Sequence, residues 1–167
     1  MAHDLVRLHD ELQAAIRGLT DVALSKAPAG KWSPGQILEH LFLSYRGTNF
    51  GIGKCLEIGK PLATSSTLPQ RLKTLVVVGF GYMPSGTDAP KVAVPKGLPT
   101  TEVRLSIFAE IEKMDSGLAD CERRFGPRVK LMDHPILGPL SVSQWRKLHL
   151  VHARHHIKQI RERAKLG

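Results

Sequence analysis

The sequence predicts an all-α protein whose helices carry the candidate functional residues. Two stretches begin with the same helix-start signal, a capping box in which a serine precedes a glutamine by three residues: Ser33 with Gln36, and Ser141 with Gln144. After each box, apolar residues recur at intervals of three and four, which is the spacing of one helix face. These two stretches should therefore form well-defined helices.

Length and composition indicate an ordinary globular protein. With 167 residues, 42% hydrophobic and 23% charged, the chain is expected to fold as a single domain, residues 1–167, with a core that needs no disulfides. No run of about 18 apolar residues predicts a membrane span, and the N-terminus lacks the pattern of a secretory signal. Two cysteines, Cys55 and Cys121, are too few for a disulfide framework, so a cytoplasmic location is expected.

The net charge of +9 raises the question of an anionic partner. A basic surface attracts nucleic acids and anionic small molecules alike. However, aromatic residues make up 5% of the chain, and no basic run is interleaved with residues that could stack on bases. Nucleic-acid binding is therefore not expected, and a solvated basic face is favoured.

Apolar periodicity and end signals predict four long helices. Their expected ranges are residues 3–18, Ser33 to about Ile58, Thr100 or Thr101 to about Arg124, and 141–165. The first should end at Gly18, and a threonine should cap the third.

The segments between these helices are less regular. Leu68–Phe80 is predicted to be a short helix, although three consecutive valines also suit a strand. Four prolines exclude a regular helix from residues 81–99, which would form a crossover or cover a pocket. Phe125–Pro139 is expected to be a loop.

Four of the eight histidines cluster near the C-terminus, at positions 149, 152, 155 and 156. His152 and His156 are one helical turn apart, so their rings project from the same, apolar face. A buried imidazole without a partner costs about 1–3 kcal/mol, and a divalent metal is one such partner. Histidines that face solvent or bond to backbone remain the alternative. The glutamate of an H-E-x-x-H metalloprotease is missing, which excludes that class.

Two further histidines could approach the same place. His40 lies in the second turn of the helix that starts at Ser33, where a hydrogen-bonded core histidine is the alternative to a metal ligand. His134 stands in Asp133-His134-Pro135, within the expected loop, and could either reach the site or lie at the surface.

These motifs together resemble the DinB-like superfamily of metal-binding proteins. The resemblance rests on Trp32-Ser-Pro-Gly-Gln-Ile-Leu-Glu-His40-Leu and on His152-x-x-x-His156-x-x-Gln159-Ile160, and it covers most of the chain in helix order. It implies a DinB/YfiT-like four-helix bundle with a long crossover connection at residues 81–99. It also implies a divalent metal held by three histidines, His40, His152 and His156.

The resemblance gives expectations for the surroundings of the metal. Zn or Ni is the expected ion, with Fe or Mn as alternatives, because imidazole suits several of these metals. Gln159, His155 and His149 are candidates for residues that support the ligands or line a pocket, with packing favoured for Gln159.

The function implied is that of a metal-dependent enzyme. Three imidazoles leave coordination positions open, as in catalytic zinc sites. The resemblance implies transfer of a low-molecular-weight thiol, or metal-assisted hydrolysis or isomerisation, with a small-molecule substrate such as an anionic thiol, and a homodimer. No catalytic residue is identified. The alternative is a non-catalytic metal-binding helical module that acts through dimerisation or a protein partner.

Overall fold

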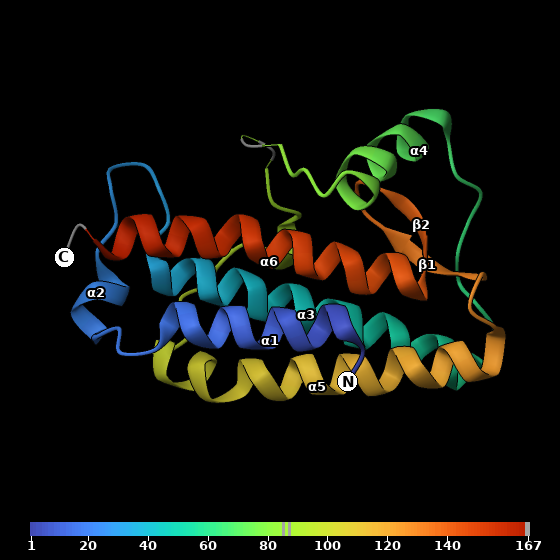
Figure 1. Cartoon of the computed structure of the whole chain (residues 1–167), viewed down its shortest axis with the longest axis horizontal. Coiled ribbons are helices and arrows are strands. Elements are labelled where there is room, and N and C mark those ends of the chain that lie inside the picture. Colours follow the sequence, from blue (N-terminus) through green and yellow to red (C-terminus); the bar gives the residue numbers. More distant parts are fainter. Residues whose placement is uncertain (85, 87, 166–167) are drawn as a thin grey trace.

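The computed structural model describes residues 1–84, 86 and 88–165 and is mainly helical, with a small two-stranded sheet (Figure 1). The expected all-α class is confirmed in this broad form. The helices are α1 (His3–Ile16), α2 (Asp21–Ser25), α3 (Pro34–Ile58), α4 (Leu68–Thr74), the π-helix η1 (Leu75–Gly79), the 3₁₀-helix η2 (Lys91–Ala93), α5 (Thr100–Phe125) and α6 (Val142–Ala164). The strands are β1 (Lys130–His134) and β2 (Gly138–Ser141).

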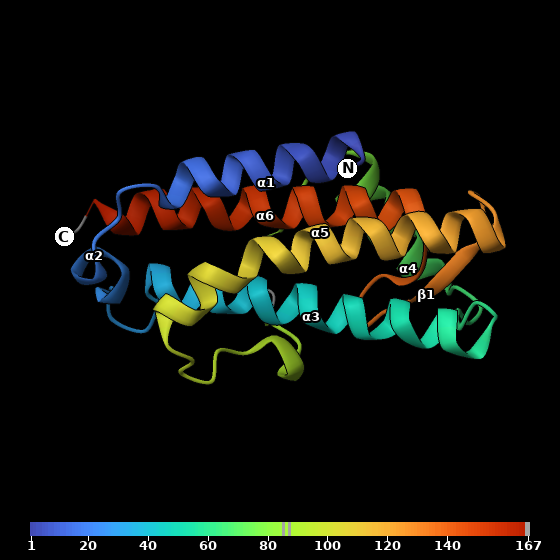
Figure 2. The same ribbon diagram turned by 90° about the horizontal axis from the view of Figure 1, so that it is seen from below.

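The four longest helices run alongside one another, as Figures 1 and 2 show from two directions. Helix α1 packs mainly against α6, and α3 packs mainly against α5. Helix α4 and the β1–β2 hairpin lie together beside one end of these helices (Figure 1). In the part of the chain that the structure describes, no helix combines the length and the apolar character that crossing a membrane requires.

Both predicted capping boxes are present. The Ser33 hydroxyl accepts a hydrogen bond from the Gln36 backbone N–H at 3.1 Å, while the Gln36 side chain accepts one from the Ser33 N–H at 2.9 Å. Ser141 and Gln144 make the same reciprocal pair at 3.4 and 3.0 Å. These bonds satisfy N–H groups that the first helical turn leaves without partners. The starts of α3 and α6 are thereby fixed.

The start of α5 differs from the prediction. Pro99, rather than Thr100 or Thr101, occupies the N-cap position, and no side chain caps this helix. Thr100 is already helical, so its hydroxyl is not at the cap position from which it could accept a bond from the first turn.

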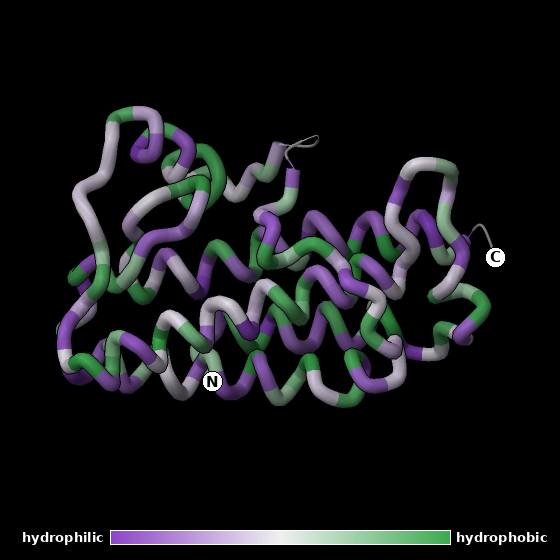
Figure 3. Tube along the Cα trace, turned by 180° about the vertical axis from the view of Figure 1, so that it is seen from behind, coloured by the Kyte–Doolittle hydropathy of each residue, from purple (hydrophilic) through white to green (hydrophobic). Residues whose placement is uncertain are grey.

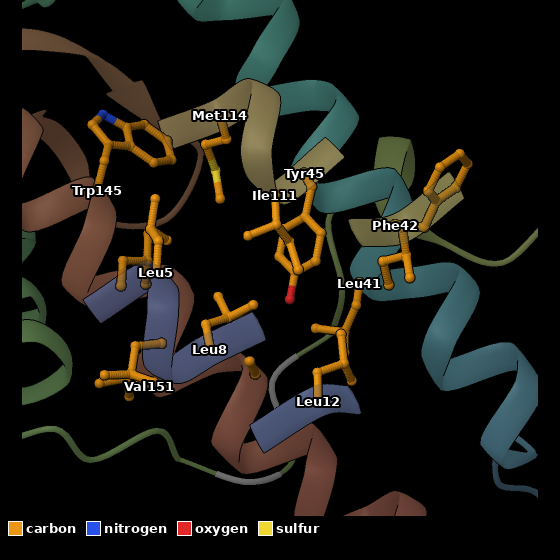
Figure 4. Packing of buried hydrophobic residues seen from close by; sticks show 14 of the residues in the cluster. Leu5, Leu8, Leu12, Leu41, Phe42, Tyr45, Ile111, Met114, Trp145 and Val151 are labelled. Atoms are coloured by element: carbon orange, nitrogen blue, oxygen red, sulfur yellow. The ribbon is translucent and has the colours of Figure 1, made fainter. Parts of the chain in front are cut away.

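Amphipathic faces of the long helices meet in one apolar core. Hydrophobic and hydrophilic residues alternate along these helices (Figure 3), as one-sided burial requires. Tyr45 of α3 reaches towards Leu8 of α1 in the middle of this core, and Ile111 of α5 lies beside it (Figure 4). Val151 brings α6 into the same cluster. The helices that carry the candidate residues are therefore anchored on one side by close packing.

The expectation of a loop over Phe125–Pro139 is wrong for the second half of this range. Strands β1 and β2 pair antiparallel, with Asp133 opposite Pro139 and His134 opposite Gly138. The strands are too short for an alternating pattern to stand out in the sequence. Gly138, with a φ of 71°, adopts a backbone conformation that glycine readily supplies at a turn. His134 therefore lies in a strand of the hairpin and not in a loop.

The segment from Leu68 to Pro99 crosses between α3 and α5. The predicted helix over Leu68–Phe80 is confirmed for Leu68–Gly79, with no strand, and its second half forms the π-helix η1. Residues 85 and 87 of the proposed crossover lie outside the described residues. The buried Glu39 carboxylate accepts backbone N–H bonds from Lys96 at 2.6 Å and Gly97 at 3.2 Å. This side chain therefore fixes the end of the segment against α3.

Alanine at Gly117 should destabilise the protein. A Cβ atom at this position of α5 would lie 2.7 Å from Cγ2 of Ile52 on α3, and a β-branched side chain has little freedom to move away. Overpacking of this kind costs about 1–3 kcal/mol. Gly53→Ala is the matched control, because that helical position has open space, and it should stabilise by about 0.5–1 kcal/mol. Urea unfolding measures the free energy of unfolding of each variant. Equal changes of the same sign in both variants would contradict the prediction.

Candidate metal centre

Three histidines converge from two helices at a point between α3 and α6. His40 comes from the second turn of α3, and His152 and His156 come from successive turns of α6. Their candidate ligand nitrogens all lie within 4.8 Å of one another. The ring centroids are 5.0 Å apart for His40 and His152, and 4.7 Å apart for each of the other two pairs. The convergence expected from the sequence is present.

Two of the three rings are oriented by hydrogen bonds to groups outside the cluster, and Nε2 of His40 also lies at hydrogen-bond distance, 3.0 Å, from Nε2 of His152. Nδ1 of His40 lies 2.7 Å from the Ala93 carbonyl oxygen, which can only accept, so Nδ1 carries the proton and donates. Nδ1 of His156 likewise donates to Oε1 of Gln159 at 2.9 Å. In a neutral imidazole the other nitrogen then holds a free lone pair. Both rings therefore offer Nε2 as a ligand atom, in the arrangement that typically orients metal-binding histidines.

The environment keeps these rings uncharged. Burial lowers the pKa of His40, and it lowers the pKa of His156 to about 3. Burial also holds the pKa of His152 well below its usual value, and the neighbouring His156 and His40 rings lower it further. At neutral pH all three imidazoles are therefore neutral, which is the form that binds a metal.

The donor set fits a divalent metal ion. Two imidazole nitrogens bound to one ion at about 2.0–2.1 Å would lie roughly 3.0–3.4 Å apart, depending on the bond angle. Nε2 of His40 and Nε2 of His152 are 3.0 Å apart. Three neutral nitrogen ligands suit Zn, Ni, Fe or Mn, and they leave coordination positions free for an exogenous group.

A large cavity gives access to the three histidines. It has a volume of about 1050 Å³, at the upper end of the range for small-molecule sites. Its lining comes from the residues just before α3, from α3, α4, η1 and α6, from the segment that follows η1, and from the hairpin. The crossover segment therefore covers a pocket, which is one of the two roles that its length suggested.

Comparison with sequence families assigns the chain to a family. A family model described as "Protein of unknown function (DUF1569)" matches residues 4–163. The chain belongs to the DUF1569 family. Comparison with curated proteins and with solved structures returned no significant match. The match spans His40, His152, His156 and the hairpin, so the whole candidate centre of this DUF1569 protein lies within the family's shared region.

The candidate supporting residues have different surroundings. Gln159 bonds to His156 and also donates from its amide nitrogen to Nε2 of His155 at 3.1 Å, so it does more than pack. His149 does not belong to the group of candidate ligands. The Thr48 hydroxyl donates to the Ser44 carbonyl at 3.1 Å and accepts from Nε2 of His149 at 3.0 Å. His149 is therefore a buried, hydrogen-bonded histidine on the cavity wall.

Other residues of the DUF1569 site escaped prediction. The Ala93 carbonyl could not be predicted, because backbone groups carry no residue-type signal. The centroid of the Trp32 ring lies 5.2 Å from that of the His40 ring, and the sequence predicted no role for Trp32 at the site. His134, by contrast, was named from the sequence as a residue that either reaches the site or lies at the surface; it is half-buried and lines the cavity. Its Nδ1 accepts backbone N–H bonds from Ile136 and Leu137, which leaves the proton on Nε2.

Replacing Gln159 by leucine should weaken metal binding about 10- to 100-fold, the usual cost of losing a hydrogen bond that orients a ligand. Leucine keeps the volume of the side chain but cannot accept the bond from Nδ1 of His156. Competition with a metal-sensitive dye measures the change in affinity. Gln159→Glu, which retains the acceptor, is the matched variant and should bind metal much as the native protein does. Equal losses in both variants would contradict an orienting role.

Proposed function

We propose that this DUF1569 protein is a metal-dependent enzyme with a three-histidine site for a divalent ion. The ligands are His40, His152 and His156, and the ion is Zn or Ni, with Fe or Mn as alternatives. The observation that carries the proposal is the meeting of three neutral imidazoles, two of them oriented by hydrogen bonds, on the wall of a cavity.

We also propose that the fold is a DinB-like four-helix bundle with a long crossover. Support comes from the four long helices that run alongside one another and from the long connection between α3 and α5. The sequence motifs around His40 and His156 support the same superfamily. The free, buried thiols of Cys55 and Cys121 suit a reducing, cytoplasmic location. The resemblance further supports a homodimer.

The proposed chemistry divides between the ion and the chain. A divalent ion bound at this site would supply Lewis acidity and would lower the pKa of a thiol or water molecule. The chain's own residues bind and orient: the three histidines hold the ion, and Ala93 and Gln159 hold two of the rings. The cavity admits a small-molecule substrate and limits water around it. Transfer of a low-molecular-weight thiol is the leading reaction, and metal-assisted hydrolysis is the other.

Elemental analysis of protein purified without a nickel column tests the site, and a turnover screen then tests the enzyme. We expect about one divalent ion per chain, and activity with an anionic thiol and electrophilic acceptors, or with small esters. A protein without bound metal would contradict the site. One ion per chain with no turnover across thiols and esters would contradict the enzyme, and would favour a metal-binding helical module that acts through a partner.

A further inference from the structure

The part of the cavity beyond the three histidines is lined mainly by apolar side chains. From His152 the wall continues along α6 towards the helix start, past Leu148 to Trp145. Trp145 and His152 are seven positions apart, which corresponds to about 10 Å of helix. Val77 of η1 and Leu137 of the hairpin face the same space. The cavity therefore extends well past the candidate metal centre, and its extension suits an apolar group.

The rim of the cavity is apolar as well. Phe50, Leu72 and Val92 all line the cavity, yet they are 70%, 64% and 70% exposed. They come from three different segments, α3, α4 and η2. Apolar side chains that surround a cavity and remain in contact with water mark grooves for apolar ligands. An apolar molecule entering here would cover the rim as well as the interior.

Gly47 leaves space in this cavity that packing does not require. Glycine weakens a helix, yet α3 contains Gly47, Gly51 and Gly53. A side chain at Gly51 would overlap the sulfur of Met132, so close packing explains that glycine. A Cβ atom at Gly47 would meet no neighbour within 4 Å, and Gly47 lines the cavity. A larger residue would therefore fill ligand space without a clash.

We propose that the substrate of this site is an amphiphilic small molecule. Its alkyl or aryl body lies in the apolar part of the cavity, and its carboxylate or thiolate head lies at the three histidines. The position of the head rests on the proposed metal-dependent function, whereas the position of the body rests on the cavity lining alone. Gly47 determines how large a body fits.

Binding of a homologous series of carboxylates tests this proposal. Both tryptophans of the chain, Trp32 and Trp145, line the cavity, so intrinsic fluorescence reports its occupation. Acetate, hexanoate, octanoate and decanoate share a head and differ in the length of the body. We expect the affinity to rise about fourfold per added methylene, the factor for burying one CH₂ group. Equal affinities for hexanoate and decanoate would overturn the proposal.

Gly47→Leu is the diagnostic variant and Gly53→Leu is its control. Both positions are exposed, lie on α3 and have open space around them, but Gly53 is not part of the cavity lining. Leucine at Gly47 should weaken decanoate binding at least tenfold and leave the metal content unchanged. Leucine at Gly53 should change neither. Unaltered decanoate affinity in a folded Gly47→Leu protein would overturn the role of this position.

Repeating the series on chelator-treated protein separates the two proposals. Removal of metal should weaken every member by a similar factor and leave the dependence on chain length intact. A protein that never takes up metal but retains this dependence would contradict the metal site and support the apolar site. A protein that binds metal but shows no dependence on chain length would support the metal site and contradict the apolar site.

Discussion

Replacing His40 by alanine should reduce the metal content of this DUF1569 protein from about one ion per chain to a small fraction of that value. His40 is the proposed ligand from α3, and without it His152 and His156 remain as a pair on one helix. Two imidazoles do not complete a structural or a catalytic zinc site. The affinity for the metal should therefore fall by more than roughly 100-fold, which is the largest usual effect of losing a residue that only supports a ligand.

His3→Ala is the matched control for His40→Ala, because the His3 side chain is 81% exposed and lies outside the cavity lining. Metal content by elemental analysis and thermal stability with and without chelator should be measured for both variants. Chelator should lower the stability of the native and His3→Ala proteins but have little effect on His40→Ala, since bound metal stabilises only the form that binds it. Full metal content in a folded His40→Ala protein would show that the ligand set is wrong.

Acidification from pH 6.5 to 5 should destabilise the protein and release the metal ion proposed to bind at the three histidines. Burial lowers the pKa of His149 and of His156 to about 3, and that of His134 to about 4, whereas an unfolded histidine titrates near about 6.5. Between these values the unfolded chain binds more protons than the folded one, so the free energy of unfolding falls as the pH falls. Above about pH 6.5 both states are neutral, and this contribution is fully present.

The expected loss is several kcal/mol, because each unit of pKa difference corresponds to about 1.4 kcal/mol and several histidines contribute. The window from pH 6.5 to 5 lies above the range in which most carboxylates titrate. Urea unfolding of chelator-treated protein measures the histidine contribution without the ion, and metal retention is measured in parallel. Stability that does not change with pH across this window would contradict the buried, neutral state of these rings.

The two helices that carry the candidate ligands were the most predictable part of the fold. Serine and glutamine three residues apart specify a local hydrogen-bond pattern that needs no distant partner, and the structure contains it at Ser33 and Ser141. Apolar periodicity likewise identified the inward face of each long helix. Local signals of this kind can be recognised in a single sequence, because the groups that interact lie within one helical turn of each other.

Features that depend on residues far apart in the chain were harder to predict from the sequence. The hairpin after α5 was expected to be a loop, because strands of five and four residues carry little periodicity. The clamp from Glu39 to the backbone of Lys96 and Gly97 joins positions far apart in the sequence and uses N–H groups that every residue but proline possesses. The Ala93 carbonyl that orients His40 belongs to the same class.

The histidine cluster of α6 shows where family resemblance added to local pattern. Spacing alone allows His149, His152 and His156 to share one broad face, and all three line the cavity. The motif ending in Gln159 singled out the last two. The structure pairs His149 with Thr48 and gathers the others with His40.

The most direct test is anomalous X-ray diffraction at the absorption edge of the metal found in protein purified without a nickel column. The account predicts one strong anomalous peak per chain, about 2.0–2.2 Å from nitrogen atoms of His40, His152 and His156. A peak bound to other residues, or metal-containing crystals with no peak between these three rings, would contradict it.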